Sequence, residues 1–300
     1  MAAARRHELT ESGFGGLLRQ WRVRRRLSQL ALAVEAEISV RHLGFLEVGR
    51  ARPSPDMVRR LSRVLDLSLR DQNALLIAAG YAPRYSETGL DAPRLAQARR
   101  ALEFMLRQQE PYPALVLDRH WNVLMANEAT RRVQEYFLDL TAVTELGPQN
   151  AMRLLFHSRA FRPYIANWEA MAAEMIQWLH REVLNGAADE QTRHLLDELL
   201  SYPGVPRQWR TADLDAPTAP FLAIELRKAD LTLRFFTTLT SFGTPHDVTL
   251  QELRIESFFP PMRRPKSPHS ILVRKAYGRP CESRRKLHGD ETRPALSLGP

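Results

Sequence analysis

Three side chains in the C-terminal third of the sequence are of the types that a hydrolase uses: Ser241, His246 and Asp247. A serine nucleophile, a histidine base and an aspartate that orients the base could together transfer an acyl group. Here, however, they surround a Gly-Thr-Pro turn, and no nucleophile elbow precedes the serine. We therefore interpret their proximity as chance, and the sequence predicts a protein that is not an enzyme.

The sequence also lacks the motifs that are typical of metal sites, of disulfide or thiol sites and of nucleotide-binding sites. One cysteine, Cys281, excludes intramolecular disulfides and a cysteine-based zinc site. The glycine-rich stretch 13–16 follows no strand, so it is not a nucleotide loop. No paired spacing such as HExxH relates the histidines, among them His120, His157, His180 and His194. The sequence therefore predicts neither a metal nor a cofactor.

Recognition of DNA fits the region 29–47 better. Ser39 follows Gln29 by ten residues, and Glu47 follows Ser39 by eight. This spacing indicates a helix, a tight turn and a second helix, and in such a motif the second helix enters the major groove. That groove is about 12 Å wide and admits one α-helix. The space between the two helices needs small or aliphatic residues, which the sequence supplies at Ala33, Ala36, Ile38, Leu43 and Leu46.

The motif lies within five short helices that the sequence predicts between residues 14 and 80. The first covers 14–25, where Leu17, Leu18 and Trp21 fall at helical spacing. Proline at position 55 occupies a favourable first helical position, and glycine at position 80 ends the last helix. Serine is a preferred N-cap residue, and each of the other four helices starts at one: Ser28, Ser39, Ser54 and Ser68.

These helices resemble the XRE/Cro-type repressor family. The residues that carry the resemblance are Leu27, Ser28, Gln29, Leu32, Ala33, Ala36, Ile38, Ser39, Leu43, Leu46, Glu47 and the run 49–54. The resemblance implies that the helix beginning at Ser39 reads the major groove through Val40, Arg41 and Phe45. Arg41 is then the best candidate for a bidentate contact with guanine, which is worth about 1–3 kcal/mol of discrimination.

The same resemblance implies supporting roles around the recognition helix. Gln29 would contact the DNA backbone and could touch a base, and His42, exposed beside Arg41, could touch a phosphate. Arg50 and Arg52, in the following loop, would make phosphate contacts that fix the register on the duplex. Arg22 and Glu47 match the family's structural ion pair between the first helix and the recognition helix.

The sequence departs from the family pattern at two positions. Glu37 stands in the turn where glycine, which adopts a positive φ without strain, is common. Gly44 stands inside the recognition helix, where it costs about 0.5–1 kcal/mol of helix stability relative to alanine. Phe45 is also unusual, and it could either pack against the adjoining loop or contact a thymine methyl group.

A second region with another periodicity begins near residue 114. Short strands are predicted over 114–118, 121–126 and 254–259, and a hairpin over 221–241. Residues 127–200 are predicted to be mainly helical, with turns near 147–148 and 185–186. A helix over 93–109 connects the regions, and its apolar face could serve either dimerisation or packing against its own domain. Strands that flank a helical insert predict an α+β fold with an antiparallel sheet.

Most of the chain, about residues 10–260, resembles regulators of the MmyB type. The matching strings are 43–47, 50–54, 70–76, 78–83, 110–114, 117–123, 126–127, 233–240, 242–245 and 253–260. The resemblance implies a PAS-like C-terminal domain that binds a small, apolar molecule such as a fatty acid, and it implies transcriptional control.

The residues themselves support a pocket less strongly. Trp168, Met171, Met175 and Trp178 follow one another at helical spacing. Such a stripe lines a ligand cavity in some proteins and is simple core in others. With Phe235, on one face of its strand, we take Trp168, Met171 and Met175 as the candidate pocket. A fatty-acid carboxylate could be held by one of three arginines, although each could equally be a solvated surface residue: Arg153, Arg159 and Arg162.

Charge divides the chain into three parts. Residues 1–85 carry 15 basic and 8 acidic side chains, residues 86–260 carry 18 and 23, and residues 261–300 carry 10 and 3. A basic head and tail around an acidic middle favour a nucleic-acid-binding module joined to another domain. No stretch of about 20 apolar residues is present, and the N-terminus has no signal-peptide pattern. We therefore expect a cytoplasmic protein without membrane association.

Together these patterns predict a helix-turn-helix domain over 10–83, a linker and connecting helix over 84–110, a PAS-like domain over 111–260 and a basic, disordered tail over 261–300. The leading hypothesis is a regulator that binds a pseudo-palindromic operator in double-stranded DNA as a homodimer and senses a small apolar effector. The alternative is a constitutive DNA-binding protein whose C-terminal domain serves dimerisation or protein interaction.

Overall fold

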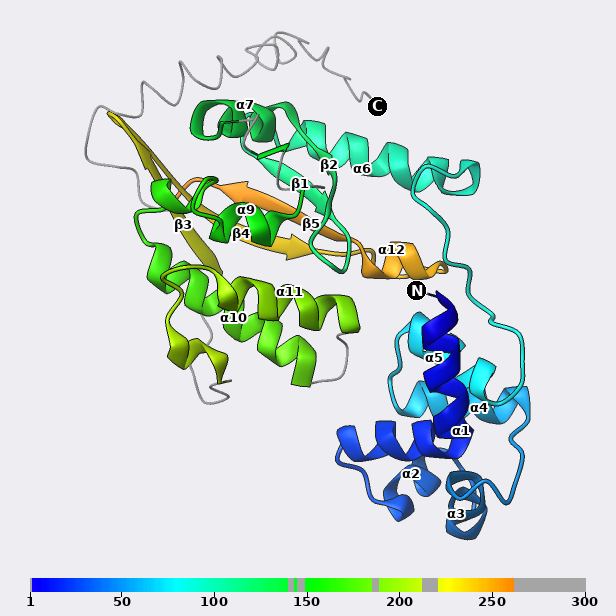
Figure 1. Cartoon of the computed structure of the whole chain (residues 1–300). Coiled ribbons are helices and arrows are strands. Elements are labelled where there is room, and N and C mark those ends of the chain that lie inside the picture. Colours follow the sequence, from blue (N-terminus) through cyan, green and yellow to red (C-terminus); the bar gives the residue numbers. More distant parts are fainter. Residues whose placement is uncertain (1, 140–142, 145–148, 185–188, 212–220, 262–300) are drawn as a thin grey trace, which may run out of the picture.

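The computed structural model of the chain describes residues 2–139, 143–144, 149–184, 189–211 and 221–261 (Figure 1). Helices make up the N-terminal region, and an antiparallel sheet with helices on both faces makes up the C-terminal region. This arrangement confirms the predicted fold class. The turns expected near 147–148 and 185–186 and, from residue 262 onward, the expected basic tail lie outside the described residues.

The N-terminal region contains the five predicted helices. They are α1 (Ala2–Arg24), α2 (Gln29–Glu35), α3 (Val40–Glu47), α4 (Pro55–Val64) and α5 (Leu69–Ala78). The hydroxyl groups of the four predicted capping serines accept backbone hydrogen bonds, in α3 from the amide of His42 at 3.1 Å. Side chains such as Leu18, Leu32, Leu43 and Leu61 are fully buried between these helices.

The first helix starts earlier than predicted and is interrupted. At Gly13 the backbone adopts φ 54° and ψ 168°, so two helical segments meet at a kink. Gly15 then allows α1 to approach the end of α3, because a Cβ at this position would lie 2.7 Å from the carbonyl carbon of Glu47. The glycine-rich stretch is therefore a packing element between α1 and α3.

The tight turn between α2 and α3 uses a residue other than glycine. Glu37 has φ 53°, in the left-handed region that glycine usually occupies. Its amide still donates to the carbonyl of Val34 at 3.1 Å, and that of Ile38 donates to Ala33 at 2.9 Å. The turn therefore has a conventional course despite the departure in sequence.

The C-terminal region is built on a five-stranded antiparallel sheet with the order β2-β1-β5-β4-β3. Its strands are β1 (Ala114–Leu117), β2 (Val123–Ala126), β3 (Leu222–Lys228), β4 (Leu231–Thr240) and β5 (Arg254–Phe259). Strands β3 and β4 form the predicted hairpin, with Lys228 paired to Leu231.

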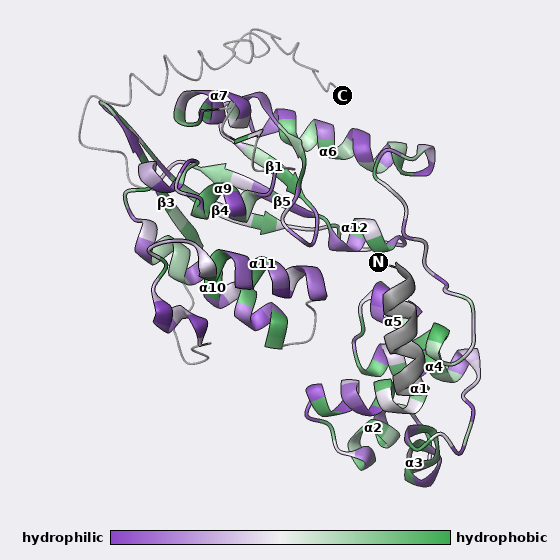
Figure 2. Cartoon of the chain, in the orientation of Figure 1, coloured by the Kyte–Doolittle hydropathy of each residue, from purple (hydrophilic) through white to green (hydrophobic). Residues whose placement is uncertain are grey.

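Helices cover both faces of the sheet (Figure 1). The helical elements are η1 (Pro93–Leu95), α6 (Ala96–Gln108), α7 (Glu128–Phe137), α9 (Ala151–Phe156), η2 (Arg162–Tyr164), α10 (Trp168–Leu184), α11 (Glu190–Ser201), η3 (Arg207–Arg210) and α12 (Val248–Glu252). Figure 1 shows α10 and α11 on one side of the sheet and α6 on the other. In Figure 2 the long helices carry both hydrophobic and hydrophilic segments, as expected for helices with one buried face.

The apolar face of α6 packs within its own domain. Leu102 and Leu106 are buried against the outer face of the sheet, where they join Ala114, Val116 and Ile255. This packing favours one of the two uses that the sequence allowed for the connecting helix. Neighbouring side chains of α6, Phe104 and Met105, remain exposed by 56% and 41%.

Candidate nucleic-acid interface and ligand-domain core

The outward face of α3 is open to solvent. Val40 is 39% exposed, and Arg41 is exposed with its guanidinium 5.4 Å from the centre of the Phe45 ring. Phe45 itself is half-buried. A Cβ at Gly44 would meet no atom within 4 Å, so the glycine leaves this face of the helix uncrowded.

A buried ion pair fixes the inward face of α3. The Arg22 guanidinium donates to both carboxylate oxygens of Glu47, from Nε at 2.6 Å and from Nη2 at 3.0 Å. Gln29 donates a third hydrogen bond to the same carboxylate at 2.7 Å. Burial alone would raise the pKa of Glu47, but these donors hold the pKa below its usual value. The cluster therefore joins α1, α2 and α3 and sets the position of α3.

The other residues predicted to bind DNA occupy different positions around α3. Ser39 caps the helix, and His42 is half-buried rather than exposed. Arg50 and Arg52 are both exposed in the loop after α3. The guanidinium of Arg52 lies beside Gly80, since a Cβ there would be 3.0 Å from its Nη2 atom.

Four arginines follow closely at the end of the first helix, at positions 22 and 24–26, and Arg25 among them has a structural role that the sequence did not indicate. Arg25 donates from Nε to the carbonyl of Leu65 at 2.8 Å and thereby holds the turn between α4 and α5. Arg24 lies over the Trp21 ring at 5.0 Å and is exposed. The Arg25 guanidinium is thus engaged within the fold, whereas the exposed Arg24 guanidinium can attract phosphates.

The four candidate pocket residues meet in one buried core. Met171, Met175 and Phe235 are exposed by 1%, 4% and 6%, and the half-buried Trp168 packs against the same cluster. As predicted, Phe235 lies on the inner face of the sheet, and Phe236 lies on the outer face, where it stacks on Phe259 at 5.2 Å. The stripe on α10 thus belongs to the centre of the C-terminal domain.

Polar groups lie among these apolar residues, and sequence reasoning missed them. Glu256 on β5 pairs with Leu115 and Leu239 across the inner face, and burial raises its pKa to about 7 although Thr237 hydrogen-bonds to it. The indole nitrogens of Trp121 and Trp168 are buried and lack a hydrogen-bond partner among the described residues. A glutamate within a strand gives no sequence signal of burial unless the register of the sheet is known.

The three arginines considered for a carboxylate are differently engaged. Arg153 donates to the carboxylate of Glu198 from Nη2 at 2.8 Å, and Arg162 lies 4.1 Å from the Trp168 ring centre. Arg159 has its backbone amide bonded to Nδ1 of His157 at 3.2 Å. The Arg162 guanidinium thus contacts a candidate pocket residue.

Ion pairs and hydrogen bonds join the two regions. Arg70 on α5 donates to both oxygens of Glu252 on α12, at 2.7 and 2.8 Å, and Glu252 also accepts from Arg119 at 3.1 Å. Arg119 lies 3.1 Å from Asp189, the cap of α11, which also contacts His120. Burial alone would raise the pKa of Asp189, but His120 and Arg119 hold the pKa well below its usual range.

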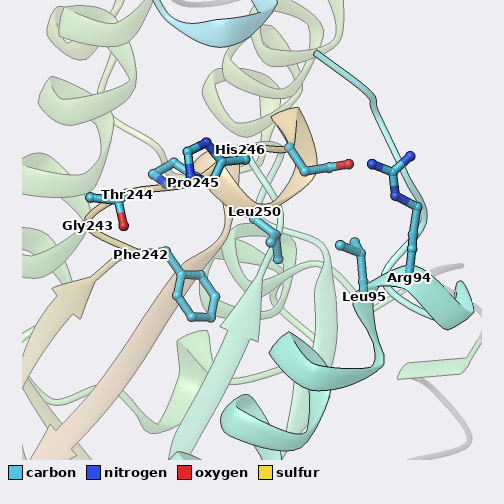
Figure 3. Close-up of a pocket in the computed structure, with 9 residues that line it drawn as sticks. Arg94, Leu95, Phe242, Gly243, Thr244, Pro245, His246 and Leu250 are labelled. Carbon is cyan, nitrogen blue, oxygen red and sulfur yellow. The ribbon is translucent and has the colours of Figure 1, made fainter.

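A shallow pocket of about 280 Å³ lies at this junction, between the start of the connecting helix and the loop before α12 (Figure 3). Phe242, Leu250 and Leu95 line it with Arg94 and the 243–247 loop. Asp247 caps α12 and accepts a hydrogen bond from Ser86 at 2.9 Å. Its carboxylate thus has a structural role, and the supposed hydrolytic cluster is part of the junction.

Within the described ranges the chain lacks a metal-binding cluster and a membrane-spanning helix. No group of three or more histidine, cysteine, aspartate or glutamate side chains there could hold a metal ion. None of the helices in the described part of the chain is both long and apolar enough to cross a membrane.

Comparison with known proteins gives two family matches. Residues 98–264 match the family described as "MmyB-like transcription regulator ligand binding domain", and residues 18–72 match "Helix-turn-helix". No curated protein matches. A solved structure titled "Structure of an RNA-binding Light-Oxygen-Voltage Receptor" is similar at 15% identity, with a TM-score of 0.26, and covers 86% of this chain. The chain spans 61% of that protein.

Proposed function

The chain belongs to the family of MmyB-like transcription regulators, and from this membership we propose how its parts divide the work. A DNA-binding domain over 10–83 reads a pseudo-palindromic operator as part of a homodimer. A linker and connecting helix over 84–110 join it to an effector-sensing domain over 111–260. The effector is a small, apolar, fatty-acid-like molecule, and the protein acts in the cytoplasm by binding rather than by catalysis.

The observation that carries this proposal is the pairing of an open outward face on α3 with a fixed inward face. Arg41 projects from the outward face, and among the described residues no carboxylate pairs with it. A free guanidinium can donate two parallel hydrogen bonds to guanine. The Arg22–Glu47–Gln29 cluster holds the helix that presents it. A positioned helix with a free arginine is what direct readout of a base edge needs.

Exposed and half-buried side chains around α3 supply contacts to the DNA backbone. Arg50 and Arg52 follow the recognition helix, and His42 and Ser39 lie at its start. Contacts of this kind fix orientation and give salt-dependent affinity, without sequence information. One such domain reads few base pairs, and a pair of them reads two half-sites one helical turn apart. A homodimer follows from that requirement.

The effector is proposed to enter the core around Trp168, Met171, Met175 and Phe235. These large side chains can rearrange around an apolar chain, since methionine adapts easily to different shapes. The neighbouring indole of Trp168 has a donor without a partner among the described residues. An acyl chain with a carboxylate could therefore satisfy both the apolar core and this donor, with Arg162 nearby.

Coupling between effector and DNA is proposed to pass through α11. Leu195 and Leu199 of this helix are buried in the effector core, and its cap, Asp189, belongs to the ion-pair chain that ends at Arg70. A shift of α11 on effector binding would move that chain and, with it, the orientation of the DNA-binding domain. The effector changes DNA affinity only as far as it prefers one arrangement.

The test begins with duplexes selected from a random pool by the purified full-length chain. Arg41→Ala should reduce the preference for selected over scrambled duplex by about 1–3 kcal/mol for each half-site, while salt-dependent binding to scrambled duplex persists. The matched control is Arg193→Ala, which removes an exposed arginine on α11. Fluorescence anisotropy measures both affinities. An unchanged preference in the Arg41 variant would contradict the readout.

The effector part of the proposal has its own test. Native mass spectrometry of the purified chain should reveal a co-purifying small molecule, or binding of added fatty acid, that Met175→Glu abolishes. Binding that survives this buried charge would contradict the proposed core. A domain that holds no small molecule and captures protein instead would favour the alternative, a constitutive DNA-binding protein with an interaction module.

A further inference from the structure

A hollow of about 510 Å³ lies on the DNA-binding domain, away from α3 and outside the effector core. Its walls are formed by α4, the turn into α5, α5 itself and the first residues of the linker. The lining residues are Arg59, Ser62, Arg63, Asp66, Leu67, Gln72, Arg84 and Tyr85. We call it the arginine hollow. Its size lies within the range of small-molecule sites.

The charge of the arginine hollow favours an anion. Three guanidinium groups line it against one carboxylate, that of Asp66. Arg59 pairs with Asp56, whereas no carboxylate among the described residues pairs with Arg63 or Arg84. Arginine side chains with free donors match the geometry of phosphate and carboxylate oxygens. Two of the three cations are therefore available to a ligand.

A buried hydroxyl in the wall provides an independent observation. Ser62 is 1% exposed, and its Oγ atom has no hydrogen-bond partner among the described residues. A serine inside a helix can donate back to the preceding turn, and this one does not. Leaving a buried hydroxyl unpaired costs about 1–3 kcal/mol, which an acceptor atom of a ligand would offset.

The remaining walls favour a ligand with more than an anionic group. Tyr85 is half-buried, with the Arg84 guanidinium 5.8 Å from its ring centre, and Leu67 is buried beside it. An aromatic ring and an arginine next to an apolar side chain can hold a planar group by stacking. A bare phosphate ion would leave this part of the hollow unfilled.

We propose that the arginine hollow binds a small nucleoside phosphate, whose phosphate meets Arg63, Arg84 and the Ser62 hydroxyl and whose base lies against Tyr85. The site differs from the effector core, and its ligand would connect α4 to the linker. Asn73 already holds the backbone amides of residues 84 and 85, at 2.9 and 3.0 Å, and the next residue, Ser86, bonds to Asp247 of the other domain. A bound nucleotide would thus fasten the linker where the two domains meet.

Isothermal titration calorimetry on the full-length chain tests the proposal with three probes: adenosine monophosphate, inorganic phosphate and adenosine. The nucleotide should bind most tightly, since it alone satisfies both the cations and the ring. Arg63→Ala and Arg84→Ala should each weaken nucleotide binding about tenfold or more. The matched control is Arg193→Ala, which should leave binding unchanged.

Ser62→Ala separates ligand binding from a merely structural role. It should weaken nucleotide binding, yet raise the melting temperature of the free chain, because it removes an unpaired buried hydroxyl. A variant that binds normally would overturn the assignment of Ser62 to the site.

Two further results would overturn the proposal. The first is that the arginine hollow shows no specific nucleotide binding: either no binding at millimolar concentration, or equal binding by the wild type and both arginine variants. The other is displacement of the nucleotide by a scrambled duplex together with loss of duplex affinity in Arg63→Ala, which would make the hollow a contact for the DNA backbone. Neither result would affect the selected-duplex test of Arg41, so the two proposals fail separately.

Discussion

The two buried cores of this chain treat their polar groups differently. In the helix-turn-helix core the buried carboxylate, Glu47, accepts three hydrogen bonds, two of them from a guanidinium. In the core of the C-terminal domain Glu256 has Thr237 as its hydrogen-bond partner, and the indole nitrogen of Trp121 has none among the described residues. The first core leaves the Ser62 hydroxyl as its one unpaired buried side-chain group among the described residues, and it presents α3 at its surface.

The second core is energetically incomplete. Buried polar groups without partners cost free energy, so a domain that retains them gains stability when a ligand supplies the partner. The difference indicates where each domain can bind a partner. The N-terminal region presents polar groups at its surface, and the C-terminal region keeps them in its interior. Four substitutions test this contrast, in order of decreasing effect.

Glu47→Ala should destabilise the chain most, by about 3–5 kcal/mol, because it leaves the Arg22 side chain, which is 12% exposed, without its counter-charge. Denaturant unfolding followed by circular dichroism measures the loss. The matched control is Glu190→Ala, a glutamate on α11 whose side chain is 80% exposed, which should change stability by less than about 0.5 kcal/mol. Equal effects of the two variants would show that the N-terminal core does not depend on its ion pair.

Glu256→Gln should change how stability depends on pH. The folded chain keeps the Glu256 proton up to about pH 7, whereas a glutamate in the unfolded chain loses it near the ordinary pKa of 4.5. The folded state therefore binds more protons between these values, and its stability falls as pH rises through that window, by up to about 3 kcal/mol. Glutamine does not titrate and can still accept from Thr237.

The variant should consequently match the wild type below pH 4.5 and exceed its stability above pH 7, as measured by thermal unfolding across the range. The matched control is Glu190→Gln on the exposed surface of α11. A wild-type profile that stays flat from about pH 5 to pH 7 would indicate that the Glu256 carboxyl is already paired in solution.

Arg70→Ala tests whether the two cores unfold together. It removes the two hydrogen bonds to Glu252 that link α5 to α12, each to a charged group and together worth about 1.5–3 kcal/mol. We expect one calorimetric transition in the wild type and two in the variant, with the preference for selected duplex retained. A single unaltered transition would mean that the ion-pair chain does not couple the domains.

Gly44→Ala should have the smallest effect and the opposite sign. A Cβ at this position meets no atom, and alanine favours the helix by about 0.5–1 kcal/mol. Thermal unfolding should therefore show a small gain in stability. A loss would mean that this face of α3 is more crowded than its geometry indicates.

The sequence predicts those parts of the chain whose determinants are local. Capping serines, the glycine at position 80 and the alternation of side chains on β4 each depend on a few neighbouring residues, and the helices and strands follow them closely. The Arg22–Glu47 contact could be predicted because the family resemblance implies this long-range pair, which composition alone does not indicate.

The polar features of the C-terminal core escaped prediction for a physical reason. The burial of Glu256 depends on its pairing with β1 and β4, and β1 lies far away in the sequence. The Arg70–Glu252 contact likewise joins residues 182 positions apart. The departure at Glu37 was visible in sequence, but only the structure reports that it keeps the positive φ of the usual glycine.

The central claim, that α3 lies in the major groove, is tested most directly by tethered cleavage. In a Cys281→Ser background, which removes the one cysteine of the chain, His42→Cys would carry an iron chelate at the start of α3. With a selected duplex bound, cuts should centre within each protected half-site, whereas the same chelate at Arg193→Cys should give none there. Protection of the duplex without cuts from position 42 would contradict the account.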